Sequence, residues 1–379
     1  TFTSAYLAHG LMNIMDKSFF GKTGITTDKP VSPYLTWEKT RQYDLGLDMD
    51  MFNYRLNVKL DYYYKYTSSL IYDIPIPGSL YAFGAQVENA MEISNEGLEL
   101  ELQADILRES AVSWRMKFNM ARNWNRFEKS YSGKDVVDGD GTLLVVGRPL
   151  NGLYVWAHRG YYNSDAEVPR LYKIDGQEIY FNGVATNGIS GAVGDYRLLD
   201  LDGDGNPDSY YAGSPLPLAH GGWVNELMWK NFDLNVLVNF TIGRKMINNR
   251  MGLGFSRQSE DGHLTKLFDY RKLRPWDGVN KKPNAPAWGN SLSMNTDSAI
   301  EKVHHLALKQ ITLGYNLPDR ISKKAGLSGV RFFLTAENLF YLSNYSGGNP
   351  EVVNIYTGRD NGDTYPLPRK YTLGLTLNF

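Results

Sequence analysis

The chain has 379 residues, a formal net charge of -1 and no cysteine. The balanced charge argues against nucleic acid as a partner, because nucleic-acid binding needs a basic face. The lack of cysteine excludes disulfides, thiolate metal sites and cysteine catalysis.

The composition still allows a membrane protein built from strands. No run of about 18 apolar residues occurs, so the sequence predicts no transmembrane helix. A strand of a membrane barrel needs only about 9–11 residues with every second one apolar. The 26 tyrosines and 8 tryptophans favour sheets and membrane–water interfaces. The chain begins at Thr1 without a signal peptide, and we expect it to be a piece of a longer precursor.

Apolar and polar residues alternate with a period of two along much of the chain. Between residues 54 and 66, one face carries Tyr54, Leu56, Val58, Leu60, Tyr62, Tyr64 and Tyr66. The other face carries charged residues such as Arg55, Lys59 and Asp61. The last segment repeats this pattern, with one face that carries Tyr371, Leu373, Leu375, Leu377 and Phe379. Long strands of this kind predict one face toward lipid and one toward water.

In chain order, the alternation predicts nine strands near residues 37–50, 54–66, 94–107, 113–127, 220–229, 231–242, 303–317, 330–340 and 370–379. Short connections lie near 51–53, 108–112, 230 and 318–329, and long ones near 67–93, 128–219, 243–302 and 341–369. This layout is typical of an outer-membrane barrel with long extracellular loops and short periplasmic turns. The sequence therefore predicts an all-β fold, a transmembrane antiparallel β-barrel in the bacterial outer membrane.

The nine predicted strands leave two open edges, which a lipid bilayer does not tolerate. We expect the missing strands to come from the N-terminal part of the same barrel or from another polypeptide. Residues 1–36 are expected to be a segment of an extracellular loop, and residues 37–379 the barrel strands and loops.

Six short motifs occur in a recognisable order. The chain ends in YPLPRKYTLGLTLNF, from Tyr365 to Phe379. The others are WEKT at 37–40, NEGLEL at 95–100, GDY at 194–196 leading into DLDGDG at 200–205, WKNFDL at 229–234, and LGYNLP at 313–318 followed by AENLF at 336–340. Together they resemble the SusC/RagA family of TonB-dependent transporters, from about Trp37 to Phe379.

The resemblance implies a barrel of about 22 strands, of which this chain would form the last nine or so. It also implies a plug domain and a TonB-contacting segment, both expected N-terminal to residue 1. A SusD-like surface lipoprotein is implied as an extracellular lid, and outer-membrane lipid as the surroundings of the barrel.

An Asp-rich stretch offers oxygen ligands at alternate positions, from Asp200, Asp202, Asp204 and Asp208. Such a set suits Ca²⁺, but the twelfth position, where an EF-hand loop has a glutamate, is Tyr211. A metal-free turn held by local hydrogen bonds is the alternative. In both interpretations the stretch would order a long external loop.

The sequence predicts no catalytic residues. The six histidines show no zinc-type spacing, and no nucleophile elbow or phosphate loop occurs. No cofactor is required, apart from the calcium ion that the external loop could hold. Aromatic residues in the predicted external loops are candidates for stacking on a ligand, namely Trp156, Trp276, Trp288, Tyr341 and Tyr345.

Three functions are compatible with the pattern. The resemblance implies import of a nutrient oligomer, either a glycan or an oligopeptide, by a TonB-dependent transporter of the type found in Bacteroidetes. A passive porin or structural barrel would lack a plug and a lid. A soluble carbohydrate-binding β-sandwich or surface enzyme would pack its apolar faces against each other and dissolve without detergent.

Overall fold

The computed structural model of the chain describes residues 12–20, 22–27, 32–76, 84–108, 110–137, 143–168, 170–172, 178–180, 193–203, 208–249, 274–279, 282–287, 296–362 and 364–379. None of the described helices is long and apolar enough to cross a membrane.

One large sheet dominates the fold. Its antiparallel strands are β3 (Lys39–Met51), β4 (Leu56–Pro75), β5 (Ala85–Leu107), β6 (Val112–Lys129), β15 (Ala219–Trp229), β16 (Phe232–Asn248), β17 (Ile300–Asn316), β18 (Gly329–Ser343) and β20 (Lys370–Asn378). Their spatial order is β20-β18-β17-β16-β15-β6-β5-β4-β3, so neighbours in sequence are neighbours in space. The short strand β19 (Arg359–Asp360) is added to β16 in parallel.

The nine predicted strands are all present, but several are longer than predicted. The connection expected at 67–93 is much shorter, because β4 continues to Pro75 and β5 begins at Ala85. The short connections lie at 52–55, 108–111, 230–231 and 317–328. The last of these contains α3 (Asp319–Ser322) and η5 (Lys323–Ala325).

The chain divides into two compact units. The first comprises Thr1–Gly46, Asp61–Leu98 and Asn123–Leu150. It contains the hairpin of β1 (Met12–Phe19) and β2 (Lys22–Thr27), which lies in the stretch expected to be an extracellular loop segment. It also contains β7 (Val136–Val137) and β8 (Leu143–Leu144). Met91, Phe127, Val136 and Leu144 form its hydrophobic cluster.

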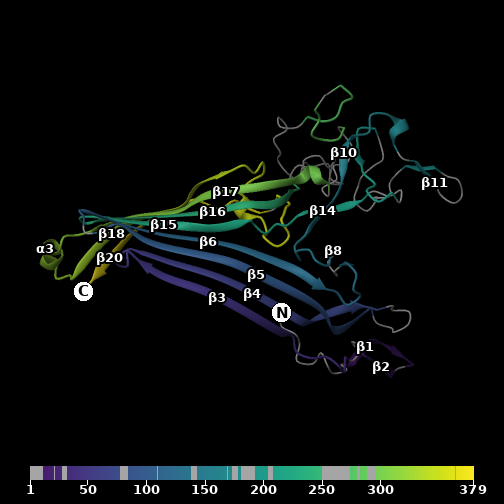
Figure 1. Cartoon of the computed structure of the whole chain (residues 1–379), viewed down its shortest axis with the longest axis horizontal. Coiled ribbons are helices and arrows are strands. Elements are labelled where there is room, and N and C mark those ends of the chain that lie inside the picture. The colour runs from purple at the N-terminus through teal and green to yellow at the C-terminus, as the bar shows by residue number, and fades with distance from the viewer. Residues whose placement is uncertain are drawn as a thin grey trace. The chain divides into compact units, whose positions relative to one another are not determined.

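The second unit comprises Leu47–Leu60, Glu99–Arg122 and Asn151–Phe379. In it β15, β16, β17, β18 and β20 run side by side, with α3 at one end of these strands (Figure 1). At the other end lie small two-stranded sheets. These pair β9 (Leu153–Trp156) with β14 (Ser209–Gly213), β10 (His158–Tyr161) with β13 (Tyr196–Leu198), and β11 (Arg170–Tyr172) with β12 (Glu178–Tyr180).

Candidate functional site on the polar face of the sheet

The alternation predicted from sequence is kept in register across neighbouring strands. A single row runs through β6, β15, β16, β17, β18 and β20, and consists of Trp114, Leu227, Leu234, Leu313, Leu334 and Leu373. Leu313, Leu334 and Leu373 are 47%, 49% and 81% exposed. Among the described residues, no second sheet packs on this face, so the β-sandwich alternative has no support. We call it the apolar face.

Two rows of aromatic side chains border the apolar face. Near the short turns, the Phe232 ring lies 4.8 Å from that of Tyr315 and 6.2 Å from that of Trp229. Farther along the strands, the Phe240 ring lies 5.9 Å from that of Phe118 and 6.1 Å from that of Trp223. We call these the lower and upper aromatic rows.

The spacing of the two rows fits a lipid bilayer. Phe232 and Phe240 are eight positions apart on β16, which is roughly 26 Å along the strand and about 20 Å along the membrane normal at the usual strand tilt of about 35–45°. Outer-membrane barrels carry an apolar band about 25 Å tall between two aromatic girdles.

The polar residue on β15 between the rows, Asn225, accepts a hydrogen bond from Trp114 Nε1 at 3.2 Å. Its amide oxygen is therefore not left unpaired against hydrocarbon.

The opposite face of the same strands is polar and carries ion pairs near the short turns. Arg115 Nε lies 2.7 Å from Asp105 Oδ1, and Lys117 Nζ lies 2.9 Å from Glu226 Oε1. Arg331 Nη2 lies 2.6 Å from Asp233 Oδ2. Each ion pair joins two different strands. The charged groups therefore tie the strands of this face together and also make the face hydrophilic. We call this the polar face.

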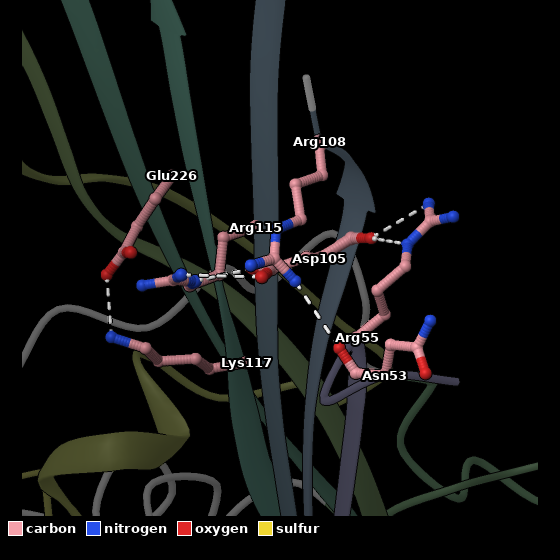
Figure 2. Close-up of polar contacts among 7 residues, drawn as sticks. All are labelled: Asn53, Arg55, Asp105, Arg108, Arg115, Lys117 and Glu226. Carbon is pink, nitrogen blue, oxygen red and sulfur yellow. Dashed lines mark hydrogen bonds and ion pairs between the residues drawn. The ribbon is translucent and has the colours of Figure 1, made fainter. Parts of the chain in front are cut away.

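Two further arginines fix the short turns at this end. Figure 2 shows Asp105 between Arg115, which binds its carboxylate, and Arg55, which binds its backbone carbonyl. Arg108 reaches back to the carbonyl of Asn53 at 3.4 Å. The contacts of Arg55, Arg108 and Arg115 are therefore ion pairs and hydrogen bonds that stabilise the turns.

The segment 349–362 folds over the polar face farther from the short turns, and we call it the strap. It contains η6 (Pro350–Val352) and β19. Arg244, only 5% exposed, donates to the carbonyls of Pro350 at 3.2 Å, Val353 at 2.9 Å and Asn354 at 2.7 Å. Because β19 also pairs with the end of β16, the strap is fixed to the sheet at both of its ends.

A carboxylate in the strap binds basic groups of β17. Glu351 Oε1 lies 3.8 Å from His305 Nε2, and Glu351 Oε2 lies 3.3 Å from Lys309 Nζ. The interaction with His305 is the main reason that the pKa of Glu351 lies below its ordinary value. Burial opposes this effect, and the charge of Lys309 adds to it. Glu351 is therefore ionised under ordinary conditions.

Two cavities lie along the strap. One has a volume of about 460 Å³ and is lined by His220, Gly222, Thr241, Arg244, His305 and Glu351, among others. The other has a volume of about 230 Å³, and Tyr341, Lys309 and Arg369 contribute to its wall. Of the predicted ligand-stacking residues, Tyr341 thus lies in the wall of a cavity, and its side chain is 42% exposed.

The other predicted aromatic residues have different surroundings. Tyr345 is 8% exposed and donates to Asp360 Oδ2 at 2.8 Å, so it packs inside the loop region. Trp156 is half-buried at the end of β9, where it bridges to Thr296. Trp276 Nε1 donates to Asn163 Oδ1 at 3.2 Å. Trp288 lies outside the described residues.

A polar and aromatic cluster that the sequence did not indicate lies in the loops of the second unit. His158 Nδ1 pairs with Asp297 Oδ1, and Tyr210 donates to the other oxygen of the same carboxylate at 3.2 Å. The His158 and Tyr196 rings meet edge to face at 4.7 Å. Burial raises the pKa of the Tyr196 hydroxyl, which accepts a hydrogen bond from Ser298 at 2.9 Å. These residues order the loops around η4 (Asp297–Ala299).

The described residues of the Asp-rich stretch, 200–203 and 208, are held in a turn by local hydrogen bonds. Asp208 Oδ2 accepts from the N–H groups of Leu201 at 2.5 Å and Asp202 at 3.1 Å, and Asp200 Oδ1 accepts from that of Gly203 at 2.6 Å. Carboxylate oxygens of Asp200, Asp202 and Asp208 lie within 4.8 Å of one another, so this exposed group could bind an ion. Asp204 lies outside the described residues.

Comparison with known proteins agrees with this geometry. Residues 13–213 match the family described as TonB dependent receptor-like, beta-barrel. The chain is 30% identical over 94% of its length to TonB-dependent receptor P26 of Formosa agariphila. It is 27% identical over 95% of its length to TonB-dependent receptor SusC of Bacteroides thetaiotaomicron. It spans about a third of each of these relatives, 36% of the first and 34% of the second.

Solved structures show the same fold. The RagAB peptide importer in its closed-closed state superposes with a TM-score of 0.76 at 23% identity, over 99% of this chain and 39% of that one. The open-open state gives a TM-score of 0.75 at 22% identity, over 100% and 38%. The predicted fold class and the resemblance to the SusC/RagA family are thereby confirmed, and the expectation that the chain is not an enzyme agrees with the family. The chain belongs to the TonB-dependent receptor-like β-barrel family, and its sheet is a portion of a barrel of the bacterial outer membrane.

Proposed function

We propose that the chain forms part of the wall of a TonB-dependent importer that takes a nutrient oligomer, glycan or oligopeptide, across the outer membrane. The observation that carries this proposal is the division of one continuous sheet into an apolar face with two aromatic rows and an ion-paired polar face. In a barrel of this family, the first face would contact lipid and the second would line the lumen.

The proposal includes parts that lie outside this chain. Relatives that it matches over about a third of their length are TonB-dependent receptors, and the solved structures of the same fold include a peptide importer called RagAB. We infer that the complete protein holds a plug, a TonB-contacting segment and the remaining strands N-terminal to residue 1. We further infer that a SusD-like lipoprotein covers the long loops.

The wall itself would carry no chemistry. Its work would be to keep a polar path open while every backbone group in lipid is paired, and energy would reach the plug through TonB. Tyr341, in a cavity on the polar face, and the tryptophans Trp156, Trp276 and Trp288 would contact the ligand. For Tyr345, burial favours a structural role. The ion that the Asp-rich turn could hold would be Ca²⁺, since its ligands are hard oxygens.

Uptake by cells tests the proposal. The full-length transporter gene, with its neighbouring lipoprotein gene if one is present, is expressed in a strain that lacks other importers, and uptake of labelled oligosaccharide and oligopeptide pools is measured. We expect uptake of one pool, and its loss when the TonB-contacting segment is deleted. Uptake that persists without this segment would indicate a passive porin and would contradict the proposal.

A further inference from the structure

The larger of the two cavities combines polar and apolar residues in its wall. It lies between the strap and the polar face of β15, β16 and β17, and its volume is about 460 Å³. Gly222 adds no side chain to its wall, and a Cβ there would stand 2.7 Å from the carbonyl oxygen of Val238. Leu237 and Val353 supply apolar wall between the polar groups. A cavity with an apolar wall and a few fixed polar groups is the usual form of a small-ligand site.

One charge in this wall lacks a counter-charge. Arg244 is only 5% exposed, and its guanidinium donates hydrogen bonds to three carbonyl oxygens of the strap. Among the described residues, no carboxylate lies within 4.0 Å of it, and its Nε–H is buried without an acceptor. A buried cation without an anionic partner is costly, and a bound anion would relieve that cost.

The carboxylate among the lining residues of this cavity pairs with basic groups of β17 and not with Arg244. Glu351 is the acidic side chain of the wall, and it is engaged by Lys309 at 3.3 Å and faces His305 at 3.8 Å. The negative charge of Glu351 is therefore balanced by basic side chains of β17. The buried Nδ1 of His220 in the same wall also lacks a hydrogen-bond partner. Arg244 Nε and His220 Nδ1 are both enclosed, so a ligand group with two acceptor oxygens and one negative charge would meet them after a small rotation of the two side chains.

We propose that this cavity between the strap and the polar face binds a carboxylate group of the transported oligomer, with Arg244 supplying the positive charge and His220 a hydrogen bond. This inference rests on the proposed function and narrows its substrate class to acidic oligomers. The carboxylate could belong to an acidic peptide or to a uronic-acid glycan, since both present the same group.

Direct binding tests the inference. The full-length transporter, with any lipoprotein that co-purifies, is titrated in detergent by calorimetry with triglutamate and with trigalacturonate. Triglutamine and galactotriose serve as neutral counterparts of similar size. We expect at least one acidic probe to bind about tenfold or more tightly than its neutral counterpart, as one charge-assisted hydrogen bond allows. The probe that shows the preference identifies the source of the carboxylate.

Variants assign the preference to the cavity. Arg244→Gln removes the charge and should abolish the preference. Because Arg244 also holds the strap, Thr241→Glu is the second variant: it leaves Arg244 in place, puts a carboxylate into the same wall and should abolish the preference too. Lys245→Gln is the control. It removes the neighbouring cation of β16, which donates to the carbonyl of Ala212 and does not line the cavity, and it should keep the preference.

Equal affinity for acidic and neutral probes would overturn the inference, and so would a preference that survives both Arg244→Gln and Thr241→Glu. Failure of the proposed function looks different. TonB-independent uptake alongside a preference that depends on Arg244 would refute the importer and keep the carboxylate site. TonB-dependent uptake without any preference for acidic probes would support the importer and refute the carboxylate site.

Discussion

Arg331 on β18 reaches Asp233 on β16 across the strand that separates them, with Nη2 2.6 Å from Oδ2. Gly314 on β17 makes this possible. A Cβ at Gly314 would stand 2.4 Å from the carboxylate of Asp233 and 2.5 Å from Arg331 Nη2. The glycine thus leaves the space in which an ion pair ties three strands of the polar face together.

Gly314→Ala should therefore separate Asp233 from Arg331 and destabilise the barrel. The pair is partly exposed, so we expect a loss of about 1–2 kcal/mol in the free energy of unfolding. The measurement is the temperature at which the full-length barrel loses its folded mobility in a detergent gel. Gly329→Ala is the matched control, because the nearest atom to its new Cβ, at 3.3 Å, is the end of the Asn378 side chain. Equal losses for both variants would show that the space at Gly314 is not special.

The assignment of the two faces predicts opposite effects at adjacent positions. Val236 lies midway between the aromatic rows on the apolar face, and Asn235 points to the polar face. Val236→Arg should cost about 2–4 kcal/mol and reduce assembly into the membrane, whereas Asn235→Arg should be tolerated. The amount of folded barrel in the outer-membrane fraction measures both. Similar assembly of the two variants would contradict the assignment of the apolar face to lipid.

The hydrogen bond between Trp114 and Asn225 should behave as a unit. Trp114→Phe removes the donor and leaves the Asn225 amide against hydrocarbon, which should cost about 1–3 kcal/mol. Asn225→Leu should cost a similar amount, because the indole N–H is then unpaired. The double variant should recover much of the loss, and a double-mutant cycle of unfolding free energies measures the coupling. Additive losses would mean that the bond contributes nothing.

Attachment of the strap should weaken in acid. The pKa of Glu351 lies below its ordinary value of 4.5, chiefly through the interaction of its carboxylate with His305. A lowered carboxyl pKa contributes stability that is complete above the unfolded value and is lost as the pH falls through the folded one. Hydrogen exchange of residues 349–360 should therefore be unchanged from about pH 7 to about pH 5, after correction for the intrinsic rate, and should rise below the unfolded pKa.

Glu351→Gln provides the comparison for this pH dependence. The amide cannot ionise, so the strap of this variant should lose part of its protection at neutral pH and show little further change in acid. If the wild type and this variant respond to pH alike, another group controls the strap.

In the Asp-rich turn, Asp208 should matter more than Asp202. Asp208 Oδ2 accepts from two backbone N–H groups, so Asp208→Ala should make the turn more sensitive to limited proteolysis even without metal. If the turn also holds Ca²⁺, added calcium should protect the wild type, and Asp202→Asn should lose that protection while the turn keeps its hydrogen bonds. Protection that is the same with calcium and with chelator would leave the metal-free turn as the correct interpretation.

The nine strands could be predicted because lipid on one face and water on the other enforce the alternation. The ends of β4 and β5 could not be predicted, since residues 67–75 and 85–93 do not alternate clearly between apolar and polar residues. The positive φ of 57° at Ser69 marks a local irregularity in β4. The hairpin at 12–27 was likewise not foreseen in the stretch expected to be a loop.

The groups of the candidate site are distant in sequence, which explains why they escaped prediction. Arg244 and the strap carbonyls that it binds are more than a hundred positions apart. Single residues such as His220 carry no local pattern, and only the register of β15 and β16 brings His220 into the wall that contains Arg244. The Asp-rich turn, by contrast, is local, so its spacing alone was enough to predict a compact structure.

The distance between the lower and upper aromatic rows also sets a hydrophobic thickness for the barrel. Lipids with longer acyl chains would have to thin near the wall, and in lipids with shorter chains the barrel would have to tilt, each at a cost of fractions of a kcal/mol per Å of mismatch. The two rows therefore match the protein to thin bilayers. Reconstitution into lipids of graded chain length should show an optimum for stability near the thickness that the rows define.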